Sequence, residues 1–238
     1  MQLIETCLEL AETDLDHIIS LLKSLNYTSA ILEIKNEIYL EKISELVNSG
    51  NIPSINDNFQ LYYRKTLQDQ GEKHHNKKNI DFWRNKCHFL VQKCNNPEMT
   101  KWATQDQRID GLSFDLLLIH QLLDLSTARM MNENEKFLEI PMKTIINPKQ
   151  NLIKISRNLL KSLKRVNIKE VPIIFSSFAS SHYDLIGKYE LKGVLSFLGI
   201  DHKYYFDFSQ IKLDTRLTRN QQRLSLDFLA PGITHSER

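Results

Sequence analysis

The feature that most constrains the fold is the alternation of short β-rich runs with helical stretches along the chain. Alternating strands and helices build parallel sheets, because each helix returns the chain to the edge where the next strand begins. Seven strands in 238 residues fit a (β/α) barrel of the TIM type, which has about 250 residues, better than a doubly wound sheet. The absent eighth strand predicts an irregular closure near the C-terminus. The predicted strands are residues 3–10, 27–34, 59–67, 88–92, 109–114, 137–142 and 172–178.

Composition is compatible with one core. Apolar residues make up 41% of the chain, and only 7 Gly and 6 Pro argue against a linker-rich chain. We predict a single domain over residues 1–238, with the barrel at about 1–200 and a helical or irregular segment at 201–238. No window of about 18 apolar residues exists and the N-terminus lacks a signal-peptide pattern, so we expect a cytoplasmic protein without membrane contact.

The segment after the sixth predicted strand shows two different helical faces. Asn147-Pro148 is a typical helix start, a capping residue followed by the proline favoured at the first position. Basic residues then recur at steps of three and four on one face, and apolar residues form a stripe on another. By contrast, residues 68–79 are polar without an apolar period and predict a loop. The basic face holds Lys154, Arg157, Lys161 and Arg165, and the stripe holds Leu152, Ile155, Leu159, Leu163 and Val166.

Charge is unevenly distributed although the net charge is only +2. Residues 1–60 hold 3 basic and 10 acidic residues, net −7, whereas residues 61–101 hold 9 and 4, net +5. Residues 149–203 hold 10 basic and 4 acidic residues, net +6. Clustered Lys and Arg bind phosphates and release counterions, so these two basic segments predict an RNA-binding surface. The first contributes Arg64, Lys65, Arg84 and Lys101, and the second contributes Lys154, Arg157, Lys161 and Lys188.

The chain contains no glycine-rich phosphate loop, no H-E-x-x-H motif and no paired cysteines or histidines of metal-binding spacing. In barrel enzymes catalytic groups stand at the carboxyl ends of strands. The residues expected there could be helix caps or ion-pair partners, or they could be metal ligands. Because the chain has no histidine cluster, we favour caps and ion pairs. We therefore predict no catalytic residue and no metal on this chain. These residues are Glu9, Glu33, Asp110, Glu139 and Ser176.

Two alternatives remain open. One is a metal-dependent phosphoesterase that uses Glu9, Glu33 and Glu139. The other is a protein-only interaction module whose acidic residues 1–60 dock a basic partner.

Several short motifs resemble, in order and spacing, those of ribonuclease P protein component 3, the archaeal form of a family whose eukaryotic member is a 30 kDa nuclear subunit. Gln107 to Phe114 is similar to the family's R-V-D-x-[IL]-S element. Phe137 to Pro141 and Pro172 to Ser177 resemble two later strands, and Glu190 to Gly199 resembles the helix that follows them. The match covers most of residues 1–200.

The resemblance implies a barrel related to the polymerase and histidinol phosphatase barrels but without their metal-binding histidines. It implies a non-catalytic protein subunit that stabilises the RNA which removes the 5′ leader from precursor tRNA, with Mg²⁺ held by that RNA. The implied partners are ribonuclease P RNA, precursor tRNA, ribonuclease P protein component 2 and the other protein subunits.

The resemblance also implies RNA contacts at Lys101 and on the basic helix that begins at Asn147-Pro148. Arg108 and Arg129 are further candidates for RNA contact. The chain departs from the family pattern at Phe178, where the family has glycine, and at Ile186, where the family has arginine before the last helix. Lys188 is expected to supply part of the charge of that arginine.

Overall fold

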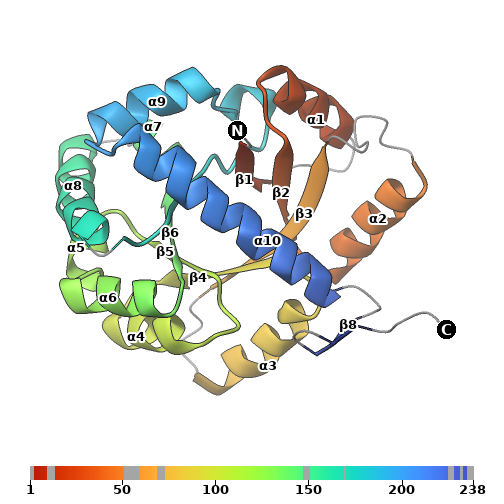
Figure 1. Cartoon of the computed structure of the whole chain (residues 1–238), viewed down its shortest axis with the longest axis horizontal. Coiled ribbons are helices and arrows are strands. Elements are labelled where there is room, and N and C mark those ends of the chain that lie inside the picture. Colours follow the sequence, from red (N-terminus) through yellow and green to blue (C-terminus); the bar gives the residue numbers. More distant parts are fainter. Residues whose placement is uncertain are drawn as a thin grey trace.

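The strands form one seven-stranded parallel sheet in the order β1 to β7, which curls into a barrel (Figure 1). The structure is a computed structural model and describes residues 3–9, 14–50, 59–68, 73–146, 151–168, 170–224, 228–230 and 233–234. All seven predicted strands are confirmed, as is the TIM-like fold. The strands are β1 (Ile4–Leu8), β2 (Ser29–Glu33), β3 (Gln60–Leu67), β4 (Phe89–Cys94), β5 (Gly111–Phe114), β6 (Phe137–Pro141) and β7 (Ile173–Ser176).

The barrel closes between β7 and β1 without a regular ladder. The link is a single parallel bridge between Leu8 and Ala179, just beyond the end of β7. The amide of Glu9 donates to the carbonyl of Ala179 at 2.8 Å, and the Thr6 hydroxyl donates to the carbonyl of Phe175 at 2.6 Å. The predicted irregular closure is therefore confirmed, and it joins the first and seventh strands.

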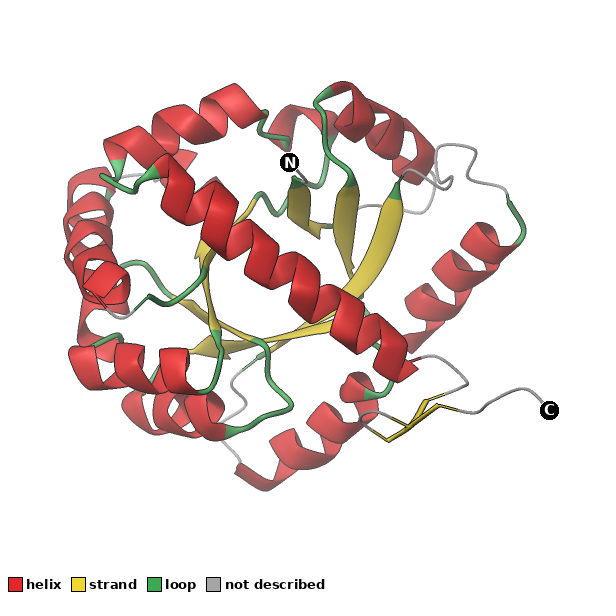
Figure 2. Ribbon diagram, viewed as in Figure 1, coloured by secondary structure: helices red, strands yellow, loops and turns green. Residues whose placement is uncertain are grey.

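Helices surround the sheet, and Figure 2 shows their alternation with the strands. Three helix starts within the described residues have side-chain caps: Asn36, Asn96 and Asp124 each accept a hydrogen bond from an amide of the first turn. The helices are α1 (Leu15–Ser24), α2 (Glu37–Asn48), α3 (Lys73–Arg84), α4 (Pro97–Gln105), α5 (Ile119–Leu122), α6 (Leu125–Glu133), α7 (Met142–Ile146), α8 (Leu152–Ile168), α9 (Lys188–Phe197) and α10 (Gln210–Leu224). The 3-10 turn His182–Asp184, the π-helix Tyr204–Ser209 and the antiparallel strands β8 (Phe228–Ala230) and β9 (Ile233–Thr234) complete the described elements.

Helix α3 corrects the prediction of a loop at residues 68–79, because it begins at Lys73. Residues 69–72 lie outside the described residues, as does the predicted helix start at Asn147-Pro148. Among the described residues, none of the helices has the length and apolarity needed to cross a membrane.

Helix α10 crosses the amino end of the barrel (Figure 1). Leu213 and Leu217, both fully buried, pack in one cluster with side chains from the strands. Polar contacts hold the same helix in place: Gln210 Oε1 accepts from the amide of Ile4 at 3.2 Å, and Asn220 Nδ2 donates to the carbonyl of His88 at 2.7 Å. Helix α10 is thus the floor of the barrel. The strand residues of the cluster are Ile4, Ile31, Tyr62, Phe89, Val91, Phe137 and Ile174.

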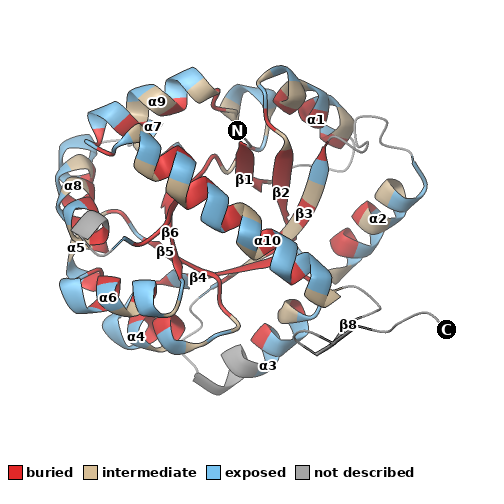
Figure 3. Ribbon diagram, viewed as in Figure 1, coloured by how far each residue is buried: buried red, intermediate tan, exposed pale blue. Residues whose placement is uncertain are grey.

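A second and larger apolar core lies between the sheet and the surrounding helices. Figure 3 shows it as buried strands that face buried stripes on otherwise exposed helices. In α8 the stripe consists of Ile155, Leu159, Leu163 and Val166, whereas Leu152 is 46% exposed. The predicted apolar stripe of this helix is therefore correct except at its first residue.

Candidate nucleic-acid interface

The carboxyl end of the barrel, where barrel enzymes place their catalytic groups, is filled by Arg64. Its side chain is 0% exposed. Nε donates to Glu33 Oε2 at 2.9 Å, and Nη1 donates to Glu139 Oε1 at 2.5 Å. The carbonyl of Thr6 and the hydroxyl of Thr66 accept two further bonds at 2.9 Å each. A buried guanidinium therefore neutralises two of the carboxylates that the sequence placed at the carboxyl ends of strands.

This arrangement contradicts the prediction that Arg64 contacts RNA, because no part of its side chain reaches the surface. It also takes Glu33 and Glu139 out of any open metal site. Glu9 stays partly exposed, and burial together with the nearby Glu33 raises the pKa of its carboxyl. Within the described residues, no group of three His, Cys, Asp or Glu side chains is placed to hold a metal ion.

Two other cations of the first basic segment are also used inside the protein. Lys65 Nζ donates to the carbonyls of Ile34 and Lys35 at 2.6 Å each, and partial burial lowers its pKa. Arg84 is 13% exposed and donates to Asp110 Oδ2 at 2.5 Å. These bonds hold neighbouring segments of the barrel together, so both residues have partners inside the protein, and an RNA contact at either one stays a prediction.

Asp110 lies before β5, at the amino end of the barrel, and not at the carboxyl end as predicted. Its carboxylate accepts from the amide of Leu90 at 2.8 Å and from Asn220 Nδ2 at 3.2 Å, besides the bond from Arg84. Arg216 approaches it at 3.4 Å. This network fastens α10 to the barrel. Nothing in the sequence pointed to it, since its members come from three distant segments.

Arg108, two residues earlier, is held in place by two carboxylates. Its Nε donates to Asp106 Oδ1 at 2.9 Å and its Nη1 donates to Asp81 Oδ1 at 2.6 Å. These bonds and charges raise the pKa of the guanidinium above its usual value. An RNA contact at Arg108 would have to compete with both partners.

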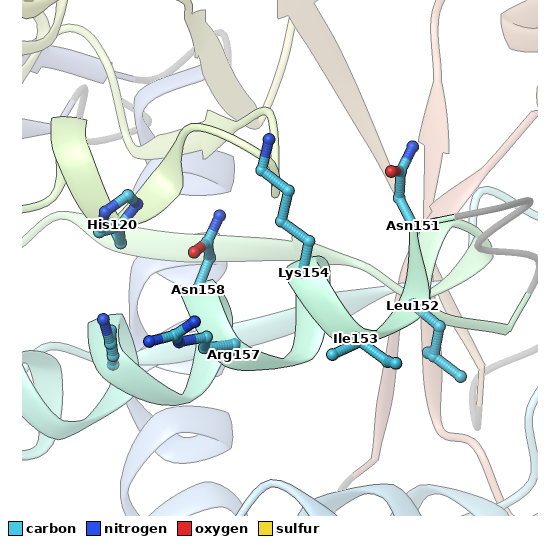
Figure 4. A pocket seen from close by; sticks show the side chains of 8 residues that line it. His120, Asn151, Leu152, Ile153, Lys154, Arg157 and Asn158 are labelled. Atoms are coloured by element: carbon cyan, nitrogen blue, oxygen red, sulfur yellow. The ribbon is translucent and has the colours of Figure 1, made fainter.

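Three cations of the second basic segment are different, because they are exposed and have no partner within the described chain. Lys154, Arg157 and Lys161 form no hydrogen bond or ion pair with the part of the chain that the structure describes. They line a groove of about 830 Å³ between α8 and α5, which we call the α5–α8 groove (Figure 4). None of the described residues that line this groove is acidic. They are His120, Asn151, Leu152, Ile153, Lys154, Arg157, Asn158 and Lys161.

Two further predicted cations lie on neighbouring helices. Helix α6 contacts both α8 and α4, and Figure 1 shows the three helices on one side of the barrel. Lys101 on α4 is exposed, and Arg129 on α6 is 70% exposed with a single partner, Glu133, at 2.8 Å among the described residues. Lys188 lies at the start of α9, half-buried, with Nζ 5.9 Å from the centre of the Phe206 ring. The structure thus places Lys101, Arg129, Lys154, Arg157 and Lys161 on three neighbouring helices at one side of the barrel.

These features define a TIM-like barrel whose interior is closed by a buried ion-pair network and whose unpaired cations lie on its outer helices. The model of the RNase P subunit p30 family matches residues 4–209, and the chain belongs to this family. It is accordingly a protein subunit of ribonuclease P, the endoribonuclease that processes tRNA, as the sequence motifs predicted.

The solved structures show the same fold. A chain in a cryo-EM structure of archaeal Ribonuclease P with mature tRNA has 16% sequence identity and a TM-score of 0.81, with 99% of each chain covered. A crystal structure of an uncharacterized protein has 10% identity and a TM-score of 0.52, covering 97% of this chain and 76% of the other. No curated protein sequence matches the chain.

Proposed function

We propose that this chain binds ribonuclease P RNA through the exposed cations of α8, α6 and α4 and performs no bond cleavage itself. The observation that carries the proposal is that Lys154, Arg157 and Lys161 line one groove whose described lining holds no acidic residue. An unpaired surface cation gains more from a phosphate than a paired one, because no existing ion pair has to be broken.

The spacing of these cations suits a polynucleotide backbone. Lys154 and Lys161 stand about two helical turns apart, roughly 10 Å along the axis of α8. Lys101 and Arg129 extend the positive side chains to two neighbouring helices. Several cations on one side of a rigid barrel offset the repulsion between phosphates, so the RNA keeps its active fold at a lower Mg²⁺ concentration.

In this proposal the partners are ribonuclease P RNA, ribonuclease P protein component 2, the other protein subunits and precursor tRNA within the complex. The structurally similar archaeal chain comes from a Ribonuclease P complex with mature tRNA, which supports this set. Mg²⁺ belongs to the RNA, and this chain holds no cofactor. We propose that the chain acts in the cytoplasm.

The test is charge reversal of the three groove cations together, Lys154→Glu, Arg157→Glu and Lys161→Glu. We expect the log–log slope of affinity for ribonuclease P RNA against salt to become shallower by about 2 to 3, since each phosphate contact contributes roughly 0.7 to 0.9. Leader cleavage by the reconstituted complex should fall in parallel at physiological salt. Filter binding and precursor tRNA cleavage measure the two effects.

A matched control reverses three exposed lysines on other parts of the barrel, Lys35→Glu, Lys203→Glu and Lys212→Glu. This variant carries the same total charge, so it separates the groove from the net charge of the protein. Equal losses in the two triple variants would remove the groove from the RNA interface.

A further inference from the structure

The α5–α8 groove has aliphatic surface beside its cations. Ile153 is 85% exposed and Leu152 is 46% exposed, both on the first turn of α8. Charge alone does not explain these two residues, because phosphates gain nothing from aliphatic side chains. The groove therefore offers a surface for an apolar group next to its anion-binding side chains.

The opposite wall of the groove carries the half-buried imidazole of His120. His120 belongs to α5, and its Nδ1 finds no hydrogen-bond partner within the described residues. Arg165 of α8 donates to the carbonyls of His120 and Leu123 at 2.6 and 2.8 Å, so α5 is fastened to α8 through its backbone. These contacts hold the half-buried ring at the groove, with the unpartnered Nδ1 itself buried.

Arg157 supplies a flat surface in the same place. Its guanidinium is exposed and unpaired within the described chain, and Figure 4 shows Arg157 on α8 between Ile153 and the turn that carries Asn158, with Asn158 nearer to His120. A guanidinium plane stacks on aromatic rings, which a lysine ammonium does not do. Asn158, beside it, already donates through Nδ2 to the carbonyl of Leu117 at 2.8 Å, which fixes this part of the groove wall.

Double-helical RNA would leave most of these groups unused. A duplex presents phosphates and sugars on its outside and keeps its bases stacked within, whereas an unpaired nucleotide exposes a ring face and its polar edges. A cavity of about 830 Å³ also falls within the range of roughly 300 to 1,000 Å³ typical of small-ligand pockets. The groove is therefore large enough for one or two nucleotides.

We propose that the α5–α8 groove takes unpaired nucleotides of the RNA, with a base stacked on Arg157 and on the aliphatic surface of Ile153, its edge near His120, and its phosphates at Lys154 and Lys161. This inference rests on the proposed function, because it names the part of the RNA that occupies the same site. It makes Arg157 and His120 the residues that distinguish single-stranded from double-stranded RNA.

The test compares two fluorescent RNA probes with equal numbers of phosphates, an unpaired oligonucleotide and a blunt duplex, by anisotropy with the full chain. We expect the unpaired probe to bind more tightly. Arg157→Lys keeps the charge and removes the planar group, so it should weaken binding of the unpaired probe about tenfold, the scale of one lost stacking contact, and change duplex binding less than twofold. His120→Ala should act in the same direction.

Lys164→Arg, an exposed position of α8 outside the groove, is the matched control and should change neither affinity. Should wild-type protein bind both probes equally, or Arg157→Lys weaken both equally, the inference would be overturned while the proposed function stands. If wild-type protein bound neither probe, both proposals would fall. Thermal unfolding of each variant confirms that it is folded.

Discussion

At the scale of single residues, Arg64 determines the chemistry of the carboxyl end of the barrel. Its guanidinium stands between Glu33 and Glu139, at the end of the barrel where an enzyme of this fold keeps reacting groups. Phe178 lies over it, with the ring centre 5.7 Å from the Arg64 guanidinium carbon. Phe178 adopts a φ of 52°, a left-handed conformation that favours glycine, which the family pattern has at this position. The strained aromatic residue thus covers the buried charge.

The first prediction at this scale concerns the buried ion pairs. Arg64→Met should destabilise the protein by about 3 to 5 kcal/mol, because it leaves two buried carboxylates without a cation. Arg129→Met, which removes an exposed pair with Glu133, should cost about 0 to 0.5 kcal/mol. Urea unfolding of the two variants measures the difference. A cost for Arg64→Met below that of Arg129→Met would contradict the structural role assigned to the network.

The second prediction concerns acid stability. Burial, with a smaller contribution from Arg223, lowers the pKa of His88 from 6.5 to about 4. Its Nδ1 accepts a hydrogen bond from the amide of Tyr63 at 3.0 Å, which a proton on that nitrogen would break. Between pH 4 and 6.5 the unfolded chain binds this proton and the folded chain does not. The stabilisation is therefore complete above pH 6.5 and is lost as the pH falls toward 4, by up to roughly 3 kcal/mol.

Thermal unfolding between pH 4 and 7 tests this expectation. His88→Gln should flatten the decline, because glutamine does not titrate. His17→Gln, at an exposed position, serves as the control and should retain the decline of the wild-type protein. An unchanged slope in His88→Gln would assign the acid sensitivity to other groups.

At the scale of elements, helix periodicity predicted α8 well and α3 poorly. In α8 the apolar side chains recur over four turns, so the buried stripe is visible in the sequence. The clearly buried residues of α3 are Ile80 and Trp83, one turn apart, and the preceding residues are polar. When only one turn of a helix carries buried apolar residues, its sequence shows no repeated apolar spacing and cannot be distinguished from that of a loop.

Helix α10 was expected only as a helical or irregular segment, and its packing against the amino end of the barrel depends on long-range contacts. Leu217→Ala should destabilise the protein by about 2 to 5 kcal/mol, since it opens a cavity among fully buried strand residues. Ile211→Ala, on the same helix and 60% exposed, should change stability by less than about 0.5 kcal/mol. Denaturant unfolding measures the stability of the two variants. A similar loss of stability in both would mean that α10 does not close the amino end of the barrel.

At the scale of the whole molecule, the acidic N-terminal segment and the basic helix α8 lie on different sides of the barrel. The acidic first 60 residues include α1 and α2, which Figure 1 shows across the barrel from α8. The fold class, the seven strands and the basic face of α8 from Lys154 to Lys161 could all be predicted, since they follow from local periodicity. Arg165, the last residue assigned to that face, instead bonds the backbone of α5. The internal hydrogen bonds and ion pairs of Arg64, Lys65 and Arg84 could not be predicted, because their partners lie far away in sequence and only the closed barrel brings them together.

The closed interior also predicts how the isolated chain behaves as an enzyme. The alternative of a metal-dependent phosphoesterase needs Glu9, Glu33 and Glu139 to be free for a metal, but Arg64 neutralises two of them. We expect the purified protein to leave a generic phosphoester intact in the presence of Mn²⁺, with a rate equal to that of the Glu9→Gln variant. Turnover that Glu9→Gln abolishes would revive the alternative.

The position of α10 bears on how the protein is made. Ribosomes deliver the chain from its N-terminus, so all seven strands emerge before the helix that seals their amino ends. Before Leu213 and Leu217 have been synthesised, Ile4, Phe89 and Phe137 of the nascent barrel lack the apolar side chains that pack against them. Half-finished chains of this kind are prone to aggregate. We therefore expect nascent copies to depend on chaperones until translation has passed α10.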